Sequence, residues 1–217
     1  MKIRINKAHF PVTVLGTGRR IGIWTQGCHI HCPGCVSRDT WDDDGGNEMD
    51  LELLLAWCRD VTQGTLNGVT ISGGEPFEQP EALGMLLDGL ASWRTEIGSS
   101  FDILCYSGMS YRRLQARFSW LLSRMDCVIP EPYVDELVEG GIWRGSSNQP
   151  VVPLSPLGRD RYQDVAGATP DRTSRFQVSI DGSRIWFIGI PRRGDLESLE
   201  KFCAERGVSL GRVSWQA

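Results

Sequence analysis

The 217-residue sequence predicts an α/β fold, a compact or partial (β/α) barrel of mainly parallel strands that ends in a hairpin and a helix. Three observations carry this prediction. Segments with strand and helix periodicity alternate, the breaks between them are short and rich in glycine or polar residues, and no internal repeat or low-complexity tract interrupts the pattern. Because the length is that of one ordinary domain, we expect residues 1–217 to form a single domain.

The first half of the chain contains alternating elements with local signals. A β segment is expected over residues 12–24, interrupted at Gly16 and Gly18, and a polar loop with clustered cysteines follows over residues 25–47. The next element is a helix, because apolar side chains recur at helical spacing in Leu51, Leu54, Leu55 and Cys58. Residues 68–72 then predict a short strand that ends in two glycines.

Further helices and strands continue this alternation. Pro80 suits a first helical turn, and the apolar face behind it contains Leu83, Leu86, Leu87 and Leu90. Residues 101–106 are the next expected strand. Ser110 can cap a third helix, whose apolar face contains Leu114, Phe118, Leu121, Leu122 and Met125. Residues 127–129 complete the parallel pattern as a buried strand.

The last third of the chain departs from this alternation. Residues 140–173 are rich in Gly, Ser, Pro, Asn and Arg, which predicts a long loop that is either functional or mobile. Residues 175–191 alternate apolar and polar around Asp181-Gly182, so we expect a hairpin that extends or edges the sheet. A final helix is expected over residues 195–206, closed by Gly207.

Composition and charge exclude several classes of protein. The chain is 41% hydrophobic and 23% charged, unlike a disordered, collagen-like or coiled-coil chain. A net charge of −4 and a pI of about 5.4 argue against binding nucleic acid by general phosphate attraction. No apolar stretch approaches the roughly 20 residues of a membrane span, and the N-terminus lacks the apolar run of a signal peptide. We therefore expect a cytoplasmic protein with neither nucleic acid nor membrane as a partner.

Three of the seven cysteines are crowded into one loop. Cys28, Cys32 and Cys35 form a C-x3-C-x2-C pattern directly after an expected strand. Iron–sulfur clusters are held by cysteine thiolates, and a four-iron cluster with three protein ligands leaves one iron open to an outside ligand. The alternative is zinc, which needs His29 or His31 as its fourth ligand although both lie inside the first spacer. In a reducing cytosol either metal group is favoured over disulfides.

A second candidate element lies at the carboxyl end of the strand expected at residues 68–72. Gly73, Gly74 and Glu75 follow this strand, and in parallel α/β sheets ligands bind at this end. Glycines let a ligand approach the backbone closely, and carbonyl oxygens together with Glu75 can accept hydrogen bonds from an ammonium group. A plain Gly-Gly turn between strand and helix is the alternative.

Together the two elements resemble the radical S-adenosylmethionine superfamily, in which a C-x3-C-x2-C loop follows the first strand and a Gly-Gly-Glu motif ends the second. The resemblance implies that the three clustered cysteines bind one 4Fe-4S cluster. It also implies that Gly73, Gly74 and Glu75 lie against the methionine moiety of S-adenosylmethionine. In this family the open iron binds the amino and carboxylate groups of S-adenosylmethionine, and an electron from the reduced cluster cleaves it to methionine and a 5′-deoxyadenosyl radical.

Segments around the cysteine motif resemble the activating enzymes of glycyl radical proteins. Residues 24–28 (WTQGC) and 38–42 (RDTWD) are similar to segments of the pyruvate formate-lyase and anaerobic ribonucleotide reductase activases. Residues 143–149 (WRGSSNQ) and Pro33-Gly34-Cys35 are similar to the ribonucleotide reductase group in particular. That group shares Gly34, where many superfamily members carry an aromatic residue near the adenine, so Gly34 is expected at the cofactor. The resemblance covers residues 1–150 and implies that residues 151–217 are a C-terminal extension.

One departure from the activase pattern follows the strand expected at residues 127–129. The pattern has an Asp that helps to hold the cofactor, followed by Gly-Pro-Tyr or a similar run, whereas this chain has Pro130-Glu131-Pro132-Tyr133 after Ile129. Pro130 offers neither a carboxylate nor a backbone donor. We therefore expect Glu131 to substitute as a cofactor contact from the next position.

Other conspicuous residues have simpler interpretations. Residues 16–21 fail the dinucleotide-binding pattern, because Ile21 stands at the third glycine and no helix follows. Trp57 and Trp120 are expected in the core. A solvated helix face is expected for Arg112, Arg113 and Arg117. Small buried hydrophobic positions are expected for the other cysteines, Cys58, Cys105, Cys127 and Cys203.

The main functional hypothesis is a radical S-adenosylmethionine enzyme that abstracts a hydrogen atom from carbon, with a glycine of a glycyl radical enzyme as the target. The chemistry belongs to the cofactor, no catalytic side chain is assigned, and a flavodoxin- or ferredoxin-like protein is the expected electron donor. The segment at residues 140–173 is expected to act as a lid that excludes water and oxygen. Two alternatives stay open: direct modification of a small molecule or peptide, and a non-catalytic iron–sulfur or zinc module.

Overall fold

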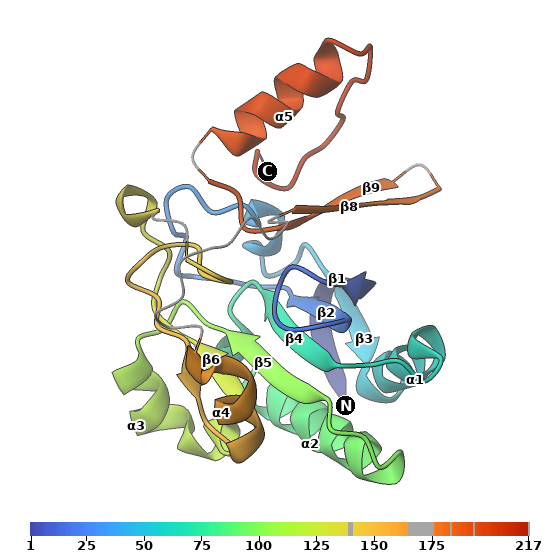
Figure 1. Cartoon of the computed structure of the whole chain (residues 1–217), viewed down its shortest axis with the longest axis vertical. Helices are drawn as coiled ribbons and strands as arrows, with labels where there is room; N and C mark the ends of the chain where they lie inside the picture. The colour runs from blue at the N-terminus through green and yellow to red at the C-terminus, as the bar shows by residue number, and fades with distance from the viewer. Residues whose placement is uncertain (139–140, 165–175, 183, 193, 217) are drawn as a thin grey trace.

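The computed structural model describes residues 1–138, 141–164, 176–182, 184–192 and 194–216. Its centre is a seven-stranded sheet with the order β3-β1-β2-β4-β5-β6-β7 (Figure 1). The middle strands are parallel: β2 Arg20–Thr25, β4 Gly68–Gly73, β5 Asp102–Tyr106 and β6 Cys127–Ile129. Antiparallel strands flank them: β1 Lys2–Val12, β3 Asn47–Asp50 and β7 Val152–Pro153. The predicted α/β fold is confirmed, as an open sheet in the manner of a partial barrel.

Three helices pack against one face of this sheet (Figure 1). They are α1 Leu51–Thr62, α2 Pro80–Glu96 and α3 Tyr111–Leu122, and α2 and α3 each connect two parallel strands. Their apolar faces were predicted by helical spacing, and the same leucines, except the half-buried Leu55, are buried against alternate residues of the middle strands. Asp50 and Ser110 cap α1 and α3 by accepting backbone N–H groups of the first turn.

The last third of the chain packs against the opposite face. Helix α4 Pro156–Tyr162 buries Tyr162 beside Leu104, Cys127 and Ile129. Strands β8 Phe176–Asp181 and β9 Arg184–Gly189 form a hairpin whose Ile188 is buried with Val12, Val14, Leu15 and Trp24. Helix α5 Asp195–Ala204 follows at the end of the molecule farthest from α2 (Figure 1).

Two predictions about strands are corrected by the structure. Residues 12–24 are not one interrupted strand, because β1 ends at Val12, residues 14–19 form bends and β2 begins at Arg20. Strand β1 was missed because charged Lys2, Arg4 and Lys7 hide its apolar alternation. The hairpin was placed correctly, but β8 and β9 pair with each other in a separate two-stranded sheet instead of extending the central one.

The predicted long loop at residues 140–173 contains regular structure in its described part. Strand β7 pairs with β6, and α4 begins at Pro156 after Ser155, whose hydroxyl accepts the Gly158 N–H. The Ser-Pro pair is an N-terminal helix signal that the composition of the segment obscured. The remainder of the predicted lid, residue 140 and residues 165–173, lies outside the described residues.

Most burial predictions are confirmed, but Trp57, Trp120 and Cys203 are less buried than predicted, and Trp57 is half-buried against the core. Cys58, Cys105 and Cys127 are buried, and the predicted arginine face of α3 is exposed. Trp120, expected in the core, is 42% exposed: its ring contacts the surface of α2 at Gly84, and the Arg124 guanidinium lies 5.2 Å from its ring centroid. Cys203 is only half-buried.

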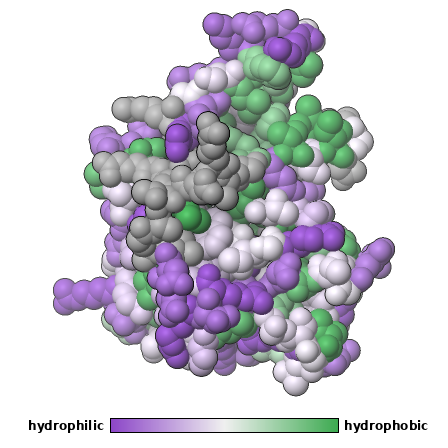
Figure 2. Space-filling view, in the orientation of Figure 1, coloured by the Kyte–Doolittle hydropathy of each residue, from purple (hydrophilic) through white to green (hydrophobic). Residues whose placement is uncertain are grey.

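The exposed surface differs between the two ends of the molecule. Figure 2 shows hydrophobic colour gathered over the hairpin and α5. The exposed apolar side chains of this end are Val178, Ile180, Ile185, Phe202 and Val208. None of the described helices is long and apolar enough to span a membrane.

A buried ion pair joins the amino ends of β2 and β5, at the end of the sheet away from the clustered cysteines. The Arg20 guanidinium donates to both carboxylate oxygens of Asp102, at 2.9 and 2.7 Å, and both side chains are fully buried. It lies above Gly68 of β4, where a Cβ would approach its nitrogen to 2.1 Å. Burial alone would raise the pKa of Asp102, but the hydrogen bond and charge of Arg20, with hydrogen bonds from Tyr162 and Arg161, outweigh it and hold that pKa below its ordinary value.

Candidate active site

All eight residues predicted to hold a cluster or cofactor line one cavity of about 190 Å³. The cavity lies at the carboxyl ends of β2, β4, β5 and β6, where parallel α/β sheets bind ligands. Its predicted members are Cys28, Cys32, Gly34, Cys35, Gly73, Gly74, Glu75 and Glu131. The predicted residues therefore converge on one space from three separate segments of the chain.

The cysteine loop leaves β2 and is anchored by the two segments that carried the resemblance to activases. The Gly27 and Cys28 N–H groups donate to the carbonyls of Thr40 and Trp41, at 2.8 and 3.1 Å. Gln26 is fully buried, and its amide donates to the Asp39 and Asp42 carbonyls. The 24–28 and 38–42 segments thus form one unit that fixes the position of Cys28.

The three cysteine side chains are free thiols, each half-buried. Burial raises the pKa of Cys28 to about 11 and also raises the pKa of Cys32. Such thiols lose their protons readily only to a cation that replaces the proton, since metal ligation requires the thiolate. Three thiols on one wall of the cavity are a donor set that fits a metal group.

The described residues favour a four-iron cluster over a single zinc ion. Thiolates of one tetrahedral zinc lie within about 4 Å of each other, given zinc–sulfur bonds of about 2.3 Å. Among the described residues, the one group of three potential ligand atoms within 4.8 Å of one another does not include these cysteines. The histidines that zinc would need have other partners, because His31 stacks on Trp41 with ring centroids 4.5 Å apart and His29 contacts two carboxylates.

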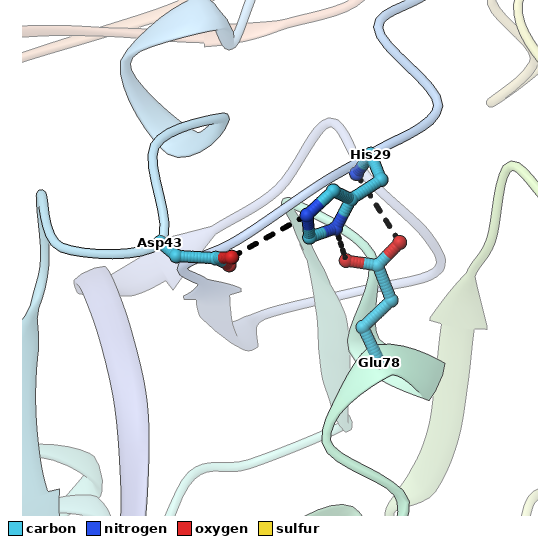
Figure 3. A group of neighbouring side chains, drawn as sticks. All are labelled: His29, Asp43 and Glu78. Atoms are coloured by element: carbon cyan, nitrogen blue, oxygen red, sulfur yellow. Dashed lines mark hydrogen bonds and ion pairs between the residues drawn. The ribbon is translucent and has the colours of Figure 1, made fainter.

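His29 ties the cysteine loop to the turn that follows the Gly-Gly-Glu motif (Figure 3). Its backbone N–H and its ring Nδ1 contact the two carboxylate oxygens of Glu78, at 3.2 and 2.9 Å, and Nε2 lies 3.4 Å from Asp43. Hydrogen bonding to Glu78 raises the pKa of this ring. Because the His29 side chain is 71% exposed, this contact orients the loop but adds little stability.

The Gly-Gly-Glu motif joins the end of β4 directly to the cysteine loop. The Gly74 and Glu75 N–H groups donate to the carbonyls of Thr25 and Gly27, at 2.9 and 2.8 Å. A Cβ on Gly73 would lie 2.3 Å from the Thr25 nitrogen, and one on Gly74 would lie 2.2 Å from the Gly27 oxygen. Glycine is therefore required at both positions by close backbone approach to the cysteine loop.

The Glu75 carboxylate is 1% exposed and connects the ends of β4 and β5. It accepts the N–H groups of Phe77 and Gly108, at 3.1 and 2.7 Å, and the Ser107 hydroxyl at 2.9 Å. Burial raises its pKa to about 7, although these hydrogen bonds act in the opposite direction. The carboxylate that was expected to face an ammonium group thus also holds the Ser107-Gly108 turn in place.

Replacing Glu75 by glutamine is expected to remove a pH dependence of stability. Since the folded pKa of about 7 exceeds the ordinary value of 4.5, the folded state binds this proton more tightly, and stability falls as pH rises through this window. The free energy of unfolding of the cluster-free protein should therefore fall by about 3 kcal/mol between pH 4.5 and pH 7 because of this group. Urea unfolding of wild type and Glu75→Gln at several pH values tests this. A variant whose free energy of unfolding depends on pH as steeply as that of wild type would contradict the assignment.

Gly34 and Glu131 complete the predicted set from two facing segments. Gly34 has φ +77°, and a Cβ there would come within 3.1 Å of both Tyr133 and Asp135. Tyr133 also lines the cavity beside Gly34. The Glu131 carboxylate accepts the Tyr111 N–H at 2.9 Å, at the start of α3, and the residue lines the cavity.

Several cavity residues were missed from the sequence. Ser107 and Gly108 follow β5, and their only signal was position at a strand's carboxyl end. Gln149 lines the cavity from the 143–149 segment, which was noted for resemblance but given no role. Gly189, Ile190 and Pro191 reach the cavity from the end of β9, which no motif indicated.

The sequence matches the family described as 4Fe-4S single cluster domain over residues 14–152. The chain belongs to this family. It is 27% identical to the anaerobic ribonucleoside-triphosphate reductase-activating protein of Escherichia coli K12 over 147 residues, which cover 66% of this chain and 94% of that protein. The corresponding protein of Enterobacteria phage T4 is 26% identical over 136 residues, 63% of this chain and 85% of the relative.

A shorter and more similar match extends to a second kind of activating enzyme. The pyruvate formate-lyase 1-activating enzyme of Escherichia coli K12 is 42% identical over 81 residues, 36% of this chain and 33% of that enzyme. Together with the family match, these relatives confirm the predicted resemblance to glycyl-radical activating enzymes of the radical S-adenosylmethionine type. The chain is an enzyme of this type with an iron–sulfur cluster, and the non-catalytic alternative is set aside.

Proposed function

We propose that this enzyme reductively cleaves S-adenosylmethionine and uses the product radical to abstract a hydrogen atom from a glycine of a partner enzyme. The observation that carries the proposal is the convergence of the three cysteines and the Gly-Gly-Glu motif on one cavity. When bound, the cluster would supply one electron to split the cofactor into methionine and a 5′-deoxyadenosyl radical, which becomes 5′-deoxyadenosine on taking the hydrogen atom. A flavodoxin- or ferredoxin-like donor would restore the electron.

In this proposal Cys28, Cys32 and Cys35 bind the cluster and hold it against one cavity wall. Gly73 and Gly74, which line the cavity at the end of β4, would let the cofactor's methionine moiety approach the backbone closely. Glu75 holds the Ser107-Gly108 turn and would accept a hydrogen bond from the ammonium group of the cofactor. The chain's own contribution is thus placement and exclusion of solvent, while the bond cleavage belongs to the cofactor.

The first test is anaerobic reconstitution with iron and sulfide, followed by reduction and chromatographic assay for 5′-deoxyadenosine. Wild type should bind about four iron atoms per chain and form the product, while a variant with all three loop cysteines changed to alanine should do neither. Cys203→Ala is the matched control, since this half-buried cysteine lies on α5 and does not line the cavity. Zinc in place of iron, or product formation by the triple variant, would contradict the proposal.

A second candidate function is direct modification of a small molecule or a peptide. The observation that favours it is the wall formed by Gly189, Ile190 and Pro191, because these residues lie beyond the 14–152 family match. Mixing the reduced enzyme and cofactor with a candidate glycyl radical protein separates the two functions. Activation predicts a lasting radical on the partner, detected by electron paramagnetic resonance, whereas direct modification predicts none.

A further inference from the structure

Glu131 has a backbone conformation that residues with a side chain rarely adopt. Its φ of +82° lies in the left-handed region, where a Cβ approaches the backbone and glycine is favoured. The run Glu131-Pro132-Tyr133 also stands where the activase pattern has Gly-Pro-Tyr. A strained backbone persists only where surrounding contacts enforce it. The contacts that hold Glu131 therefore indicate the role of its conformation.

Two neighbouring side-chain amides hold the strained segment from the turn at residues 145–149. The Gln149 Nε2 donates to the Glu131 carbonyl at 2.9 Å, and the Asn148 Nδ2 donates to the Pro132 carbonyl at 2.8 Å. On its other side, the Glu131 N–H donates to the Met109 carbonyl at 2.9 Å. The backbone around Glu131 is therefore fixed from both directions.

The orientation of the Gln149 amide is set by its own turn. Its Oε1 accepts the N–H groups of Gly145 and Ser146, at 2.9 and 3.2 Å, so its Nε2 must be the atom that faces Glu131. The side chain is only 8% exposed, and both Gln149 and Gly145 line the cavity. Because both the oxygen and the nitrogen of this buried amide make hydrogen bonds, Gln149 links the turn rigidly to Glu131.

We propose that Gln149 is a positioning residue, which holds Glu131 in its left-handed conformation so that the Glu131 carboxylate stays at the cavity wall to accept a hydrogen bond from the bound cofactor. This rests on the proposed function, since the cofactor is S-adenosylmethionine. The carboxylate stands one position after Pro130, on a backbone that would suit glycine better. Gln149 is thus what allows a glutamate to occupy that position.

The strain is tested without any cofactor, on the cluster-free protein. Glu131→Ala and Glu131→Gly both remove the carboxylate and its bond to Tyr111, but only glycine relaxes the left-handed backbone. The glycine variant should unfold at the higher urea concentration, the reverse of the order at ordinary positions, where glycine is less stable than alanine. An alanine variant as stable as the glycine variant would overturn the inference of strain.

The positioning role is tested by equilibrium dialysis of S-adenosylmethionine against the reconstituted, oxidised enzyme, in which no turnover occurs. Gln149→Ala should weaken binding about tenfold, the equivalent of one hydrogen bond, and Glu131→Ala by at least as much. In the Glu131→Ala background, Gln149→Ala should weaken binding no further, because Gln149 acts through Glu131. The free energy of unfolding lost through each of the two single changes should instead also be lost in the double variant.

Each of the other possible outcomes would contradict one part of the proposal. If the two changes weakened binding additively, Gln149 would have a merely structural role. If Glu131→Ala bound the cofactor as tightly as wild type, Glu131 would only cap α3, and the positioning proposal would fall. If wild type assembled its cluster but bound no S-adenosylmethionine, the proposed function itself would fail, while the order of the alanine and glycine variants would still decide the inference of strain.

Discussion

Replacing Asp102 by alanine should lower the free energy of unfolding by about 3–5 kcal/mol. The change leaves the Arg20 guanidinium fully buried without the carboxylate that now faces it with two hydrogen bonds. It also removes the acceptor of the Tyr162 hydroxyl, at 2.6 Å, and a partner of Arg161. One substitution therefore leaves several donors without their acceptor, at the junction of β2, β5 and α4.

Asp88→Ala is the matched control for this prediction. Asp88 also pairs with an arginine, Arg124, at 2.6 Å, but its side chain is 59% exposed, so its loss should cost no more than about 1 kcal/mol. Urea unfolding of both variants on cluster-free protein measures the difference. Equal losses for the buried and exposed pairs would refute the argument from burial.

The Asp102 prediction also has a pH signature. Its folded pKa is held below the ordinary value of 3.8, so the carboxylate stabilises the folded state above that pH and loses this contribution as pH falls through the lowered folded pKa. The stability difference between wild type and Asp102→Ala should therefore be constant from neutral pH down to about pH 4 and shrink in stronger acid. A difference that grew on acidification would contradict the assigned direction.

Hydrophobic periodicity predicted those segments in which the burial of apolar side chains alone determines the residue pattern. Helices α1 to α3 and strands β4 to β6 bury one face or both, so apolar spacing alone revealed them. Strand β1 was hidden because its neighbours leave much of it half-buried, which lets charged residues alternate with Ile3 and Ile5. The separate sheet of β8 and β9 was unpredictable for another reason, because hairpin signals specify a turn and not the surface on which the hairpin packs.

Motifs predicted the site only where the residue type itself is required. Cysteine spacing and the Gly-Gly-Glu run identified their side of the cavity, since thiols bind metal and only glycine permits the contact with Gly27. Ser107 and Gln149 were missed because their roles arise from distant partners, the Glu75 carboxylate and the Glu131 carbonyl. A hydroxyl or amide carries no such information until the fold brings its partner within hydrogen-bond reach.

Changing Gly74 to alanine should reduce 5′-deoxyadenosine formation by at least about 100-fold, through a displacement in the cysteine loop. The new Cβ would lie 2.2 Å from the Gly27 carbonyl oxygen, whereas real Cβ contacts essentially never fall below 3.0 Å. The two backbones must therefore separate by about 1 Å, which breaks the bond from the Glu75 N–H to Gly27 and moves the neighbouring Cys28. Gly74 tests this contact more cleanly than Gly73, because Gly73 has φ +107° and would add backbone strain.

Gly211→Ala is the matched control for the Gly74 variant, because a Cβ at Gly211 meets open space and its φ is not positive. That variant should keep wild-type iron content and product formation. The iron content separates two causes of lost product formation in Gly74→Ala. A depleted cluster means that Cys28 has moved. A full cluster without product means that the new methyl group fills the cofactor's place beside β4. A Gly74→Ala enzyme with full iron and wild-type product formation would show that the loop relaxes freely, and the close approach of β4 to the cysteine loop would then have no role in the reaction.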